Sequence, residues 1–299
     1  MNPFPIKFVA ILLVFWSTQV AGAPLTVFFL AGDSISGRIL DSVRKEIESR
    51  SSAFLSRARF DGVYRPNELV IAFGVEGARA AASLDQRIPV LNLFIPKHAF
   101  EKIMPGRKGG RFSVIYIDQP VSRQMRLVRL AFPEKHRIGV LLGPDSRGEL
   151  PVLEKAASEY GLELSSGKVE SQSQLFSVLD EVVKESDVIL AVPDPLVFNS
   201  GTISGILLTA YRYNIPLVGF SPSYAKAGAL IALYSTVEQV GWQAAEAVSE
   251  FAGKSVLPTP AYPSYFTVGI NRYVARSMGV EIQDEATFEE KLSQMEGSP

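Results

Sequence analysis

Residues 25–34 read LTVFFLAGDS, and this stretch contains the pattern that decides the fold. The run from Leu25 to Leu30 is apolar throughout, as expected of a strand that is buried on both faces of a sheet. A small polar break follows, in which Asp33 or Ser34 can cap a helix. Apolar residues then recur at helical spacing from Ile35 to Ile47. This order of strand, turn and helix is the repeating unit of a parallel α/β sheet.

The same unit recurs along the rest of the chain. Further strands are predicted at residues 68–73, 89–95, 112–117, 137–142, 162–169, 187–192, 215–220, 230–234 and 265–270. Helices are predicted at residues 78–84, 121–131, 149–160, 172–184, 201–213, 237–252 and 272–278. About ten strands are more than one open sheet usually contains. We therefore predict an α/β fold with two lobes, each built on a doubly wound parallel sheet of about five strands.

The chain is expected to cross between the lobes three times, which makes a three-segment hinge. Asp118-Gln119-Pro120 is the best first crossing, because proline interrupts regular structure there. The others are predicted near Tyr234-Ser235 and from Pro258 to Pro263. Lobe 1 would then contain residues 23–118 with 235–259, and lobe 2 residues 119–234 with 260–288. Residues 289–299 are predicted to be a frayed tail.

The first 22 residues have the pattern of a cleaved signal peptide. Lys7 is followed by an apolar run from Phe8 to Trp16 that is too short to span a bilayer as a mature helix. Small residues around Gly22 and Ala23 suit cleavage after either of them. The alternative is an uncleaved membrane anchor. We expect export to the periplasm, and the absence of cysteine excludes a lipid-anchored cysteine at the cleavage site.

Several kinds of chemistry are disfavoured by composition. The formal net charge of −1 provides no basic field for nucleic acid. The two histidines, His98 and His136, have no partner at metal-ligand spacing, and we expect both to be solvated surface residues. Neither a nucleophile elbow nor a dinucleotide fingerprint is present. We therefore predict no metal site, no cofactor and no enzymatic activity; an enzyme using Asp33, Glu76 and Asp194 is the competing hypothesis.

The ends of the predicted strands are the best place to look for a ligand site. Ligands of parallel sheets bind beyond the carboxyl ends of the strands, where helix N-termini offer free amide groups. The loops there are rich in small polar residues, and Phe94, Phe198 and Tyr224 are close to them in sequence. Asp194 lies between two prolines, and its carboxylate could receive a ligand amine or cap the helix that begins near Ser200.

Six motifs carry a resemblance to a known family. They are IYIDQP at 115–120, IGVLLGP at 138–144, LAVPDP at 190–195, IPLVGFS at 215–221, AGAL at 227–230 and VGWQAA at 240–245. In these motifs the chain resembles the ABC-transporter substrate-binding family that includes bacterial tryptophan- and tyrosine-binding proteins, which has the type I periplasmic binding fold. The C-terminal half matches well, whereas lobe 1 matches only in its general layout. Many relatives are lipoproteins, from which this cysteine-free chain departs.

The resemblance implies two lobes that close on a small molecule. With the residue pattern, it suggests a set of ligand-binding residues: Gly32, Asp33, Ser34, Gly74, Val75, Glu76, Phe94, Asp194, Phe198, Ser221, Ser223, Tyr224 and Gly228. The expected function is that of a periplasmic binding protein of an ABC importer, with an amino-acid-like or aromatic carboxylate ligand and a permease as partner. The alternative is a periplasmic protein that binds a ligand and reports to a membrane sensor.

Overall fold

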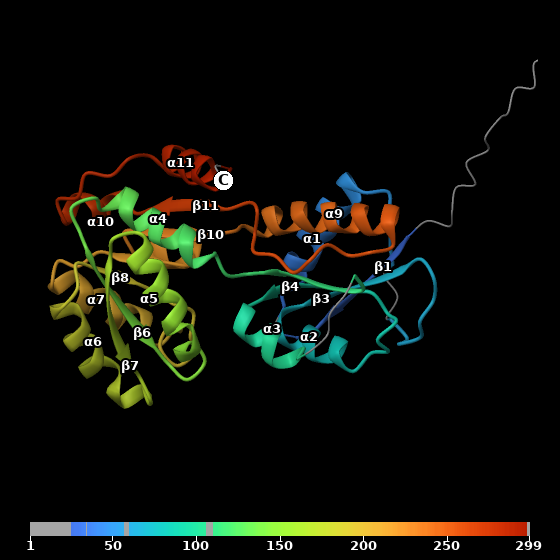
Figure 1. Ribbon diagram of the computed structural model, residues 1–299, viewed down its shortest axis with the longest axis horizontal. Coiled ribbons are helices and arrows are strands. Elements are labelled where there is room, and N and C mark those ends of the chain that lie inside the picture. Colours follow the sequence, from blue (N-terminus) through green and yellow to red (C-terminus); the bar gives the residue numbers. More distant parts are fainter. Residues whose placement is uncertain (1–24, 34, 57–59, 106–109, 298–299) are drawn as a thin grey trace, which may run out of the picture.

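The computed structural model describes residues 25–33, 35–56, 60–105 and 110–297. Two α/β lobes lie side by side along the long axis of the molecule (Figure 1). The predicted fold class is therefore confirmed: each lobe has its own mainly parallel sheet. The predicted signal peptide, residues 1–22, lies outside the described residues. Within the described part of the chain, no helix is both long and apolar enough to cross a membrane.

Lobe 1 is built on five parallel strands in the order β2-β1-β3-β4-β5. Their bounds are β1 (Thr26–Ala31), β2 (Phe54–Leu55), β3 (Glu68–Phe73), β4 (Val90–Ile95) and β5 (Phe112–Tyr116). Helices α1 (Gly37–Arg50) and α9 (Val237–Lys254) cover one face, and α2 (Gly74–Ala82) and α3 (Lys97–Ile103) cover the other (Figure 1). Alternate residues of β3 serve the two layers: Ile71 packs with α1 and α9, and Val70 packs with α2 and α3. This two-sided burial explains the continuous apolar strands.

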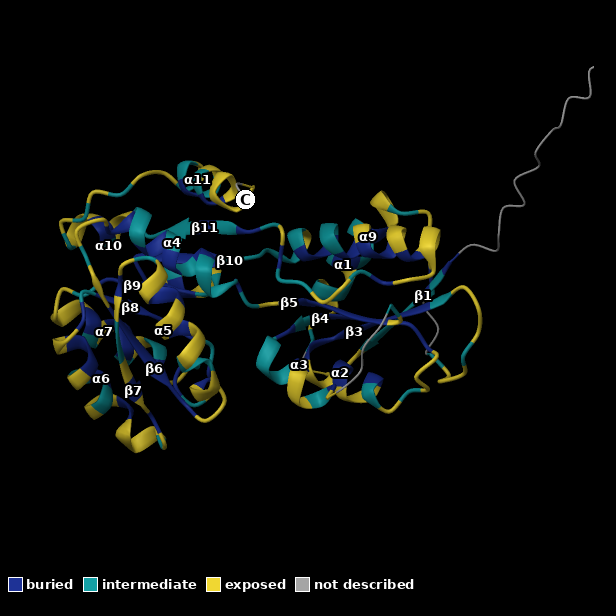
Figure 2. Ribbon diagram, viewed as in Figure 1, coloured by how far each residue is buried: buried dark blue, intermediate teal, exposed yellow. Residues whose placement is uncertain are grey.

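Lobe 2 has six strands in the order β11-β10-β9-β8-β6-β7. Their bounds are β6 (Arg137–Leu142), β7 (Glu163–Lys168), β8 (Val188–Leu190), β9 (Leu217–Gly219), β10 (Ile231–Tyr234) and β11 (Thr267–Ile270). One face packs on α4 (Val121–Ala131), α5 (Leu150–Glu159), α10 (Arg272–Ser277) and α11 (Glu285–Gly297). The other face packs on α6 (Leu175–Lys184), α7 (Ile203–Arg212) and α8 (Pro222–Ala227). The interiors of both lobes are buried, and the outer faces of the helices are exposed (Figure 2).

Three local features differ from the sequence predictions. Strand β11 is antiparallel to β10, because β10 ends at the hinge and β11 begins there. The expected frayed tail is instead most of helix α11, in which Phe288 and Leu292 are fully buried. Its stability comes from that contact with lobe 2, which the local sequence does not reveal. The segment after Pro96, which is not among the predicted helices, forms helix α3.

The chain crosses between the lobes at residues 117–120, 235–236 and 255–266. The Arg123 guanidinium joins these crossings. Its Nη1 donates to Gln119 Oε1 at 2.6 Å and to the Pro263 carbonyl at 2.9 Å. Gln119 Nε2 donates in turn to Ser235 Oγ at 2.9 Å. Arg123 also forms an ion pair at 2.6 Å with Glu296 of α11, so one buried cation connects the hinge to the C-terminal helix. The lobe limits given above remain a prediction.

Candidate functional site

A cavity of about 560 Å³ lies between the two lobes. Lobe 1 contributes α3, lobe 2 contributes the loop after β6 and the start of α5, and the crossings contribute Asp118, Gln119 and Tyr262. A second cavity of about 450 Å³ adjoins it and shares His98, Lys102, Asp145 and Pro193. These volumes are typical of small-molecule sites. Because both lobes line both cavities, movement of one lobe against the other would change their shape.

The second cavity has an apolar character. Its wall contains Val75 of α2, Ala99 and Ile103 of α3, and Phe198 and Phe220 of lobe 2. The Phe198 and Phe220 rings meet edge to face, with centroids 6.1 Å apart. Such a wall suits the apolar or aromatic part of a ligand.

A further hollow of about 470 Å³ lies in lobe 1, lined among others by Tyr64, Glu68, Arg111 and Phe251. Its walls come from lobe 1 alone, so lobe movement would not close it. The cavities between the lobes are therefore the better candidates for a ligand site.

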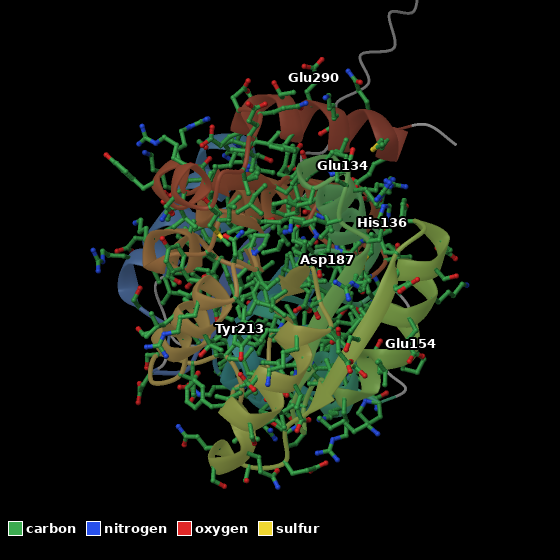
Figure 3. All side chains as sticks on the ribbon, turned by 90° about the vertical axis from the view of Figure 1, so that its left-hand side faces the viewer. Glu134, His136, Glu154, Asp187, Tyr213 and Glu290 are labelled. Carbon is green, nitrogen blue, oxygen red and sulfur yellow. The ribbon has the colours of Figure 1, made fainter. Side chains whose placement is uncertain are left out.

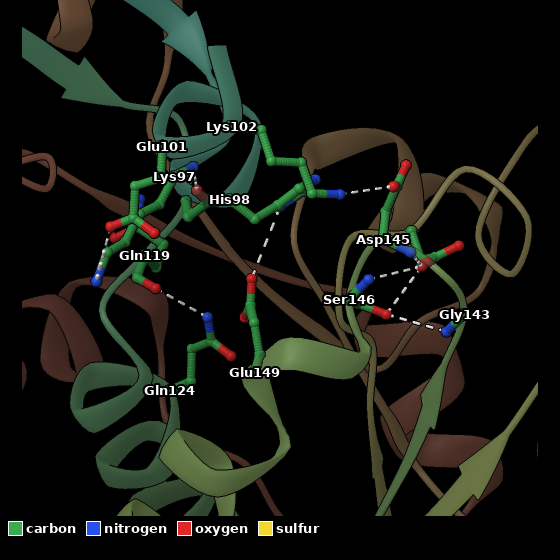
Figure 4. A network of polar contacts seen from close by, with 12 residues as sticks. Lys97, His98, Glu101, Lys102, Gln119, Gln124, Gly143, Asp145, Ser146 and Glu149 are labelled. Carbon is green, nitrogen blue, oxygen red and sulfur yellow. Dashed lines mark hydrogen bonds and ion pairs between the residues drawn. The ribbon is translucent and has the colours of Figure 1, made fainter. Parts of the chain in front are cut away.

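Two ion pairs cross the cleft from α3 to lobe 2 (Figure 4). Lys102 Nζ lies 3.1 Å from Asp145 Oδ1, and His98 Nδ1 lies 3.7 Å from Glu149 Oε1. The contact with Glu149 raises the pKa of His98, against the opposing effect of burial. Charges on the two lobes are thus complementary at the cleft, which favours approach of the lobes. The prediction that His98 is a solvated surface residue is wrong, because its side chain is only 18% exposed and reaches across to lobe 2. His136, in contrast, is exposed on lobe 2 beside Asp187, as predicted (Figure 3).

The position of α3 depends on Asp118 of the first crossing. The helix has Pro96 at its N-cap, which offers no side-chain acceptor, and the Lys97 N–H instead donates to Asp118 Oδ2 at 2.6 Å. Burial raises the pKa of Asp118 to about 6, the hydrogen bond from Lys97 opposes this, and the nearby charge of Glu149 adds to it. A half-buried carboxyl group with such a pKa, facing a cavity, is typical of a functional site.

The opposite wall of the cleft is held by Asp194. Its Oδ2 accepts hydrogen bonds from the backbone N–H groups of Asp145 and Ser146, at 3.1 and 2.9 Å, and from Ser146 Oγ at 2.9 Å. Its Oδ1 accepts from the Leu196 N–H at 2.9 Å. Gly143 makes the approach possible, because a Cβ there would lie 2.3 Å from Asp194 Oδ1. The carboxylate thus shapes the loop that presents Asp145 and Glu149 to lobe 1.

A family model described as ABC transporter substrate binding protein matches residues 63–291, which is most of the chain. The chain belongs to this family. Its members bind substrates and are not enzymes. No curated protein matches the chain.

Solved structures show the same type I periplasmic binding fold. The open, ligand-free CD0873 of Clostridium difficile, a substrate binding protein with adhesive properties, has a TM-score of 0.66 and 16% identity over 87% of this chain and 96% of that one. An ABC domain from Streptococcus pneumonia in complex with L-Trp has a TM-score of 0.61 and 16% identity over 89% and 98% of the two chains. A conserved domain protein from Vibrio cholerae has a TM-score of 0.60 and 18% identity over 88% and 97%.

Within this substrate-binding protein, three of the residues suggested by the sequence line the cleft cavities: Val75, Asp194 and Phe198. Ser34 lies outside the described residues. The other suggested residues of lobe 1 lie at the carboxyl edge of its sheet but outside the two cavity walls; they are Gly32, Asp33, Gly74, Glu76 and Phe94. The Glu76 side chain covers Gly32, where a Cβ would lie 1.8 Å from its Oε2. These residues remain predicted ligand contacts.

The remaining suggested residues belong to α8 and its flanks. Ser221 Oγ and Ser223 Oγ are 2.7 Å apart and bond to each other. Tyr224 is buried, and its ring packs on Phe220 with centroids 4.5 Å apart. Gly228 ends the helix with φ +128°. None of these four lines either cleft cavity, so here too a ligand role stays a prediction.

Several cavity residues were not suggested as ligand contacts by the sequence, namely His98, Lys102, Phe220 and Tyr262. His98 and Lys102 are four residues apart on α3, and recognising that helix would have placed them on one face. Tyr262 belongs to the third crossing, which becomes part of the cavity only when the lobes are assembled.

Proposed function

We propose that this protein is the exported substrate-binding component of an ABC importer. In this role it would bind an amino-acid-like or aromatic carboxylate compound between its lobes in the periplasm, and the closed form would be recognised by a permease. The observation that supports this most directly is the pair of adjoining cavities lined by both lobes and by the hinge. The related structure bound to L-Trp supports an amino-acid-like ligand.

The geometry is suited to a binding cycle rather than to chemistry. The cross-lobe ion pairs are exposed enough to break in the open form, since Lys102 and Asp145 have side chains 62% and 46% exposed. A ligand that bridges the two walls adds contacts that exist only in the closed form, and so shifts the population toward closure.

The test is binding of a panel of amino acids, their deaminated acids and their decarboxylated amines, measured by calorimetry and by thermal shift. A ligand present at one hundred times its Kd stabilises the protein by about 2.7 kcal/mol, which would raise Tm by roughly 5–10 °C. A flat response to the whole panel by cleanly folded protein would contradict the proposal.

Binding in the cleft is tested by filling the cavity. Val75, 36% exposed, lines the second cavity, and Val75→Trp places a large ring there. We expect it to weaken binding at least tenfold, an effect of about 1.4 kcal/mol. The matched control is Val63→Trp, at an exposed position of lobe 1 outside both cavity walls, which should leave affinity unchanged. Equal affinities of the two variants would place the ligand elsewhere.

A further inference from the structure

Asp118 lines the larger cavity and has no ion-pair partner among the described residues. It lies half-buried on the first crossing, between β5 and α4, and lines the cavity wall. Its Oδ2 accepts the hydrogen bond from the Lys97 N–H. Among the residues that the structure describes, no lysine, arginine or histidine forms an ion pair with it. The carboxylate can therefore accept further hydrogen bonds from a group in the cavity.

The other charges around the cavity are balanced. Lys102 pairs with Asp145 at 3.1 Å and His98 with Glu149 at 3.7 Å. Lys97 lies 4.0 Å from Glu101, and its Nζ also lies 5.5 Å from the centre of the Tyr262 ring.

Arg147, the remaining cation of the wall, is turned to Glu170 outside the cavity, at 2.9 Å. Asp118 is thus left in the cavity wall without an ion-pair partner among the described residues, although the charge of His98 acts on it from a longer distance.

We propose that the Asp118 carboxylate receives an ammonium group of the ligand. This inference rests on the proposed function and deepens it, because it assigns the ligand to the primary amines. A half-buried carboxylate beside a second one, Glu149, is stabilised by a cation, and an alkylammonium brings a positive charge together with further N–H donors. The apolar second cavity, with Phe198 and Phe220, would take the body of the same molecule.

Asp118 also has a structural role, since it caps α3, and the test must separate the two. Asp118→Asn keeps an oxygen that accepts from the Lys97 N–H and removes only the negative charge. The matched control is Glu154→Gln, which removes one negative charge from an exposed position of α5 outside both cavity walls.

The experiment measures calorimetric affinities of the wild type and both variants for three probes that share one ring system: tryptophan, tryptamine and indole-3-propionate. The same triad based on phenylalanine is measured in parallel. We expect Asp118→Asn to lower the affinity for the amine-bearing probes at least tenfold. Its affinity for the deaminated acids should be unchanged or higher. Glu154→Gln should change every affinity less than threefold.

The pH dependence provides a second readout. Groups facing Asp118 are Lys97 and His98 of α3, Tyr116 of β5, Tyr262 of the third crossing and Glu149 of lobe 2. The wild-type affinity for the amines should fall as pH decreases through about 6, where Asp118 gains its proton. Asp118→Asn should lack this component and keep only the part due to His98.

The results that would overturn the inference differ from those that would overturn the function. Deaminated acids that bind while amines do not, or an equal loss for both classes in Asp118→Asn, would refute the role of Asp118 and leave a binding protein. Absence of binding by every probe would contradict the proposed amino-acid-like or aromatic ligand, and the inference with it.

Discussion

Replacement of Arg123 by methionine is expected to destabilise the protein substantially. The guanidinium is almost fully buried, with a side chain 4% exposed, and donates two 2.6 Å hydrogen bonds to the carboxylate of Glu296. It also donates to Gln119 and Pro263, and stacks 4.2 Å from the centre of the Phe266 ring. Methionine keeps most of the apolar stem but leaves these acceptors unpaired.

The magnitude follows from the exposure of the two partners. Removal of one member of a buried ion pair costs about 3–5 kcal/mol. Glu296 is 28% exposed and can turn to water, so the lower end, about 3 kcal/mol, applies. For a chain of this size, each kcal/mol corresponds to a Tm change of about 2–4 °C, and Tm should fall by roughly 6–12 °C.

The assay is denaturant and thermal unfolding of Arg123→Met, with Arg126→Met as the matched control. Arg126 lies on the same helix and donates one hydrogen bond, at 2.8 Å, to the Tyr160 hydroxyl, so its loss should cost about 1 kcal/mol. A double-mutant cycle with Glu296→Gln should give a coupling energy above about 1 kcal/mol. Equal effects of the two methionine variants, or no coupling, would show that Arg123 does not connect the hinge to α11.

Three further outcomes are expected. Leu292→Ala, which truncates a fully buried side chain of α11, should cost about 2–5 kcal/mol in unfolding free energy, and a cost below 1 kcal/mol would mean that this helix is frayed. Asp194→Ala should cost about 3 kcal/mol, because Ser146 and the loop N–H groups lose their acceptor, and ligand affinity should fall with it if Asp194 shapes the cleft. The pKa of Asp118, raised from 3.8 to about 6, means that the folded protein binds more protons than the unfolded chain between these values, so stability falls as pH rises through them. Asp118→Asn should therefore gain in Tm relative to the wild type between about pH 4 and pH 7, and a constant difference would contradict this reasoning.

The core strands could be predicted because each is buried on both faces. Ile71 and Val70 of β3 pack on opposite layers, and the neighbouring strands follow the same rule, so an unbroken apolar run was a sufficient signal. Helix α3 was missed because it has seven residues and its capping acceptor, Asp118, is 21 positions away. Helix α11 was missed because burial of Phe288 and Leu292 against lobe 2, rather than a strong local pattern, stabilises it.

The lining of the candidate site could be predicted only in part, for a similar reason. Strand-end loops do lie near the cleft, and Val75, Asp194 and Phe198 line its cavities. Whether a given loop is open or covered depends on side chains from elsewhere in the chain: Glu76 fills the space above Gly32, although the two are distant in sequence. Contacts of this kind join residues far apart in the chain and leave no periodic pattern in the sequence.

The alternation of the main strands and helices, the two-sheet architecture, the absence of cysteine and the presence of only two histidines were determined by the sequence alone, since hydrophobic periodicity and composition are local properties. The tertiary structure decided which polar groups meet. Lys102 and Asp145 are 43 positions apart and Arg123 and Glu296 are 173 apart, yet each pair is in contact. Hydrogen bonds and ion pairs act over a few ångströms, and only the assembly of two lobes through three crossings brings these side chains within that range.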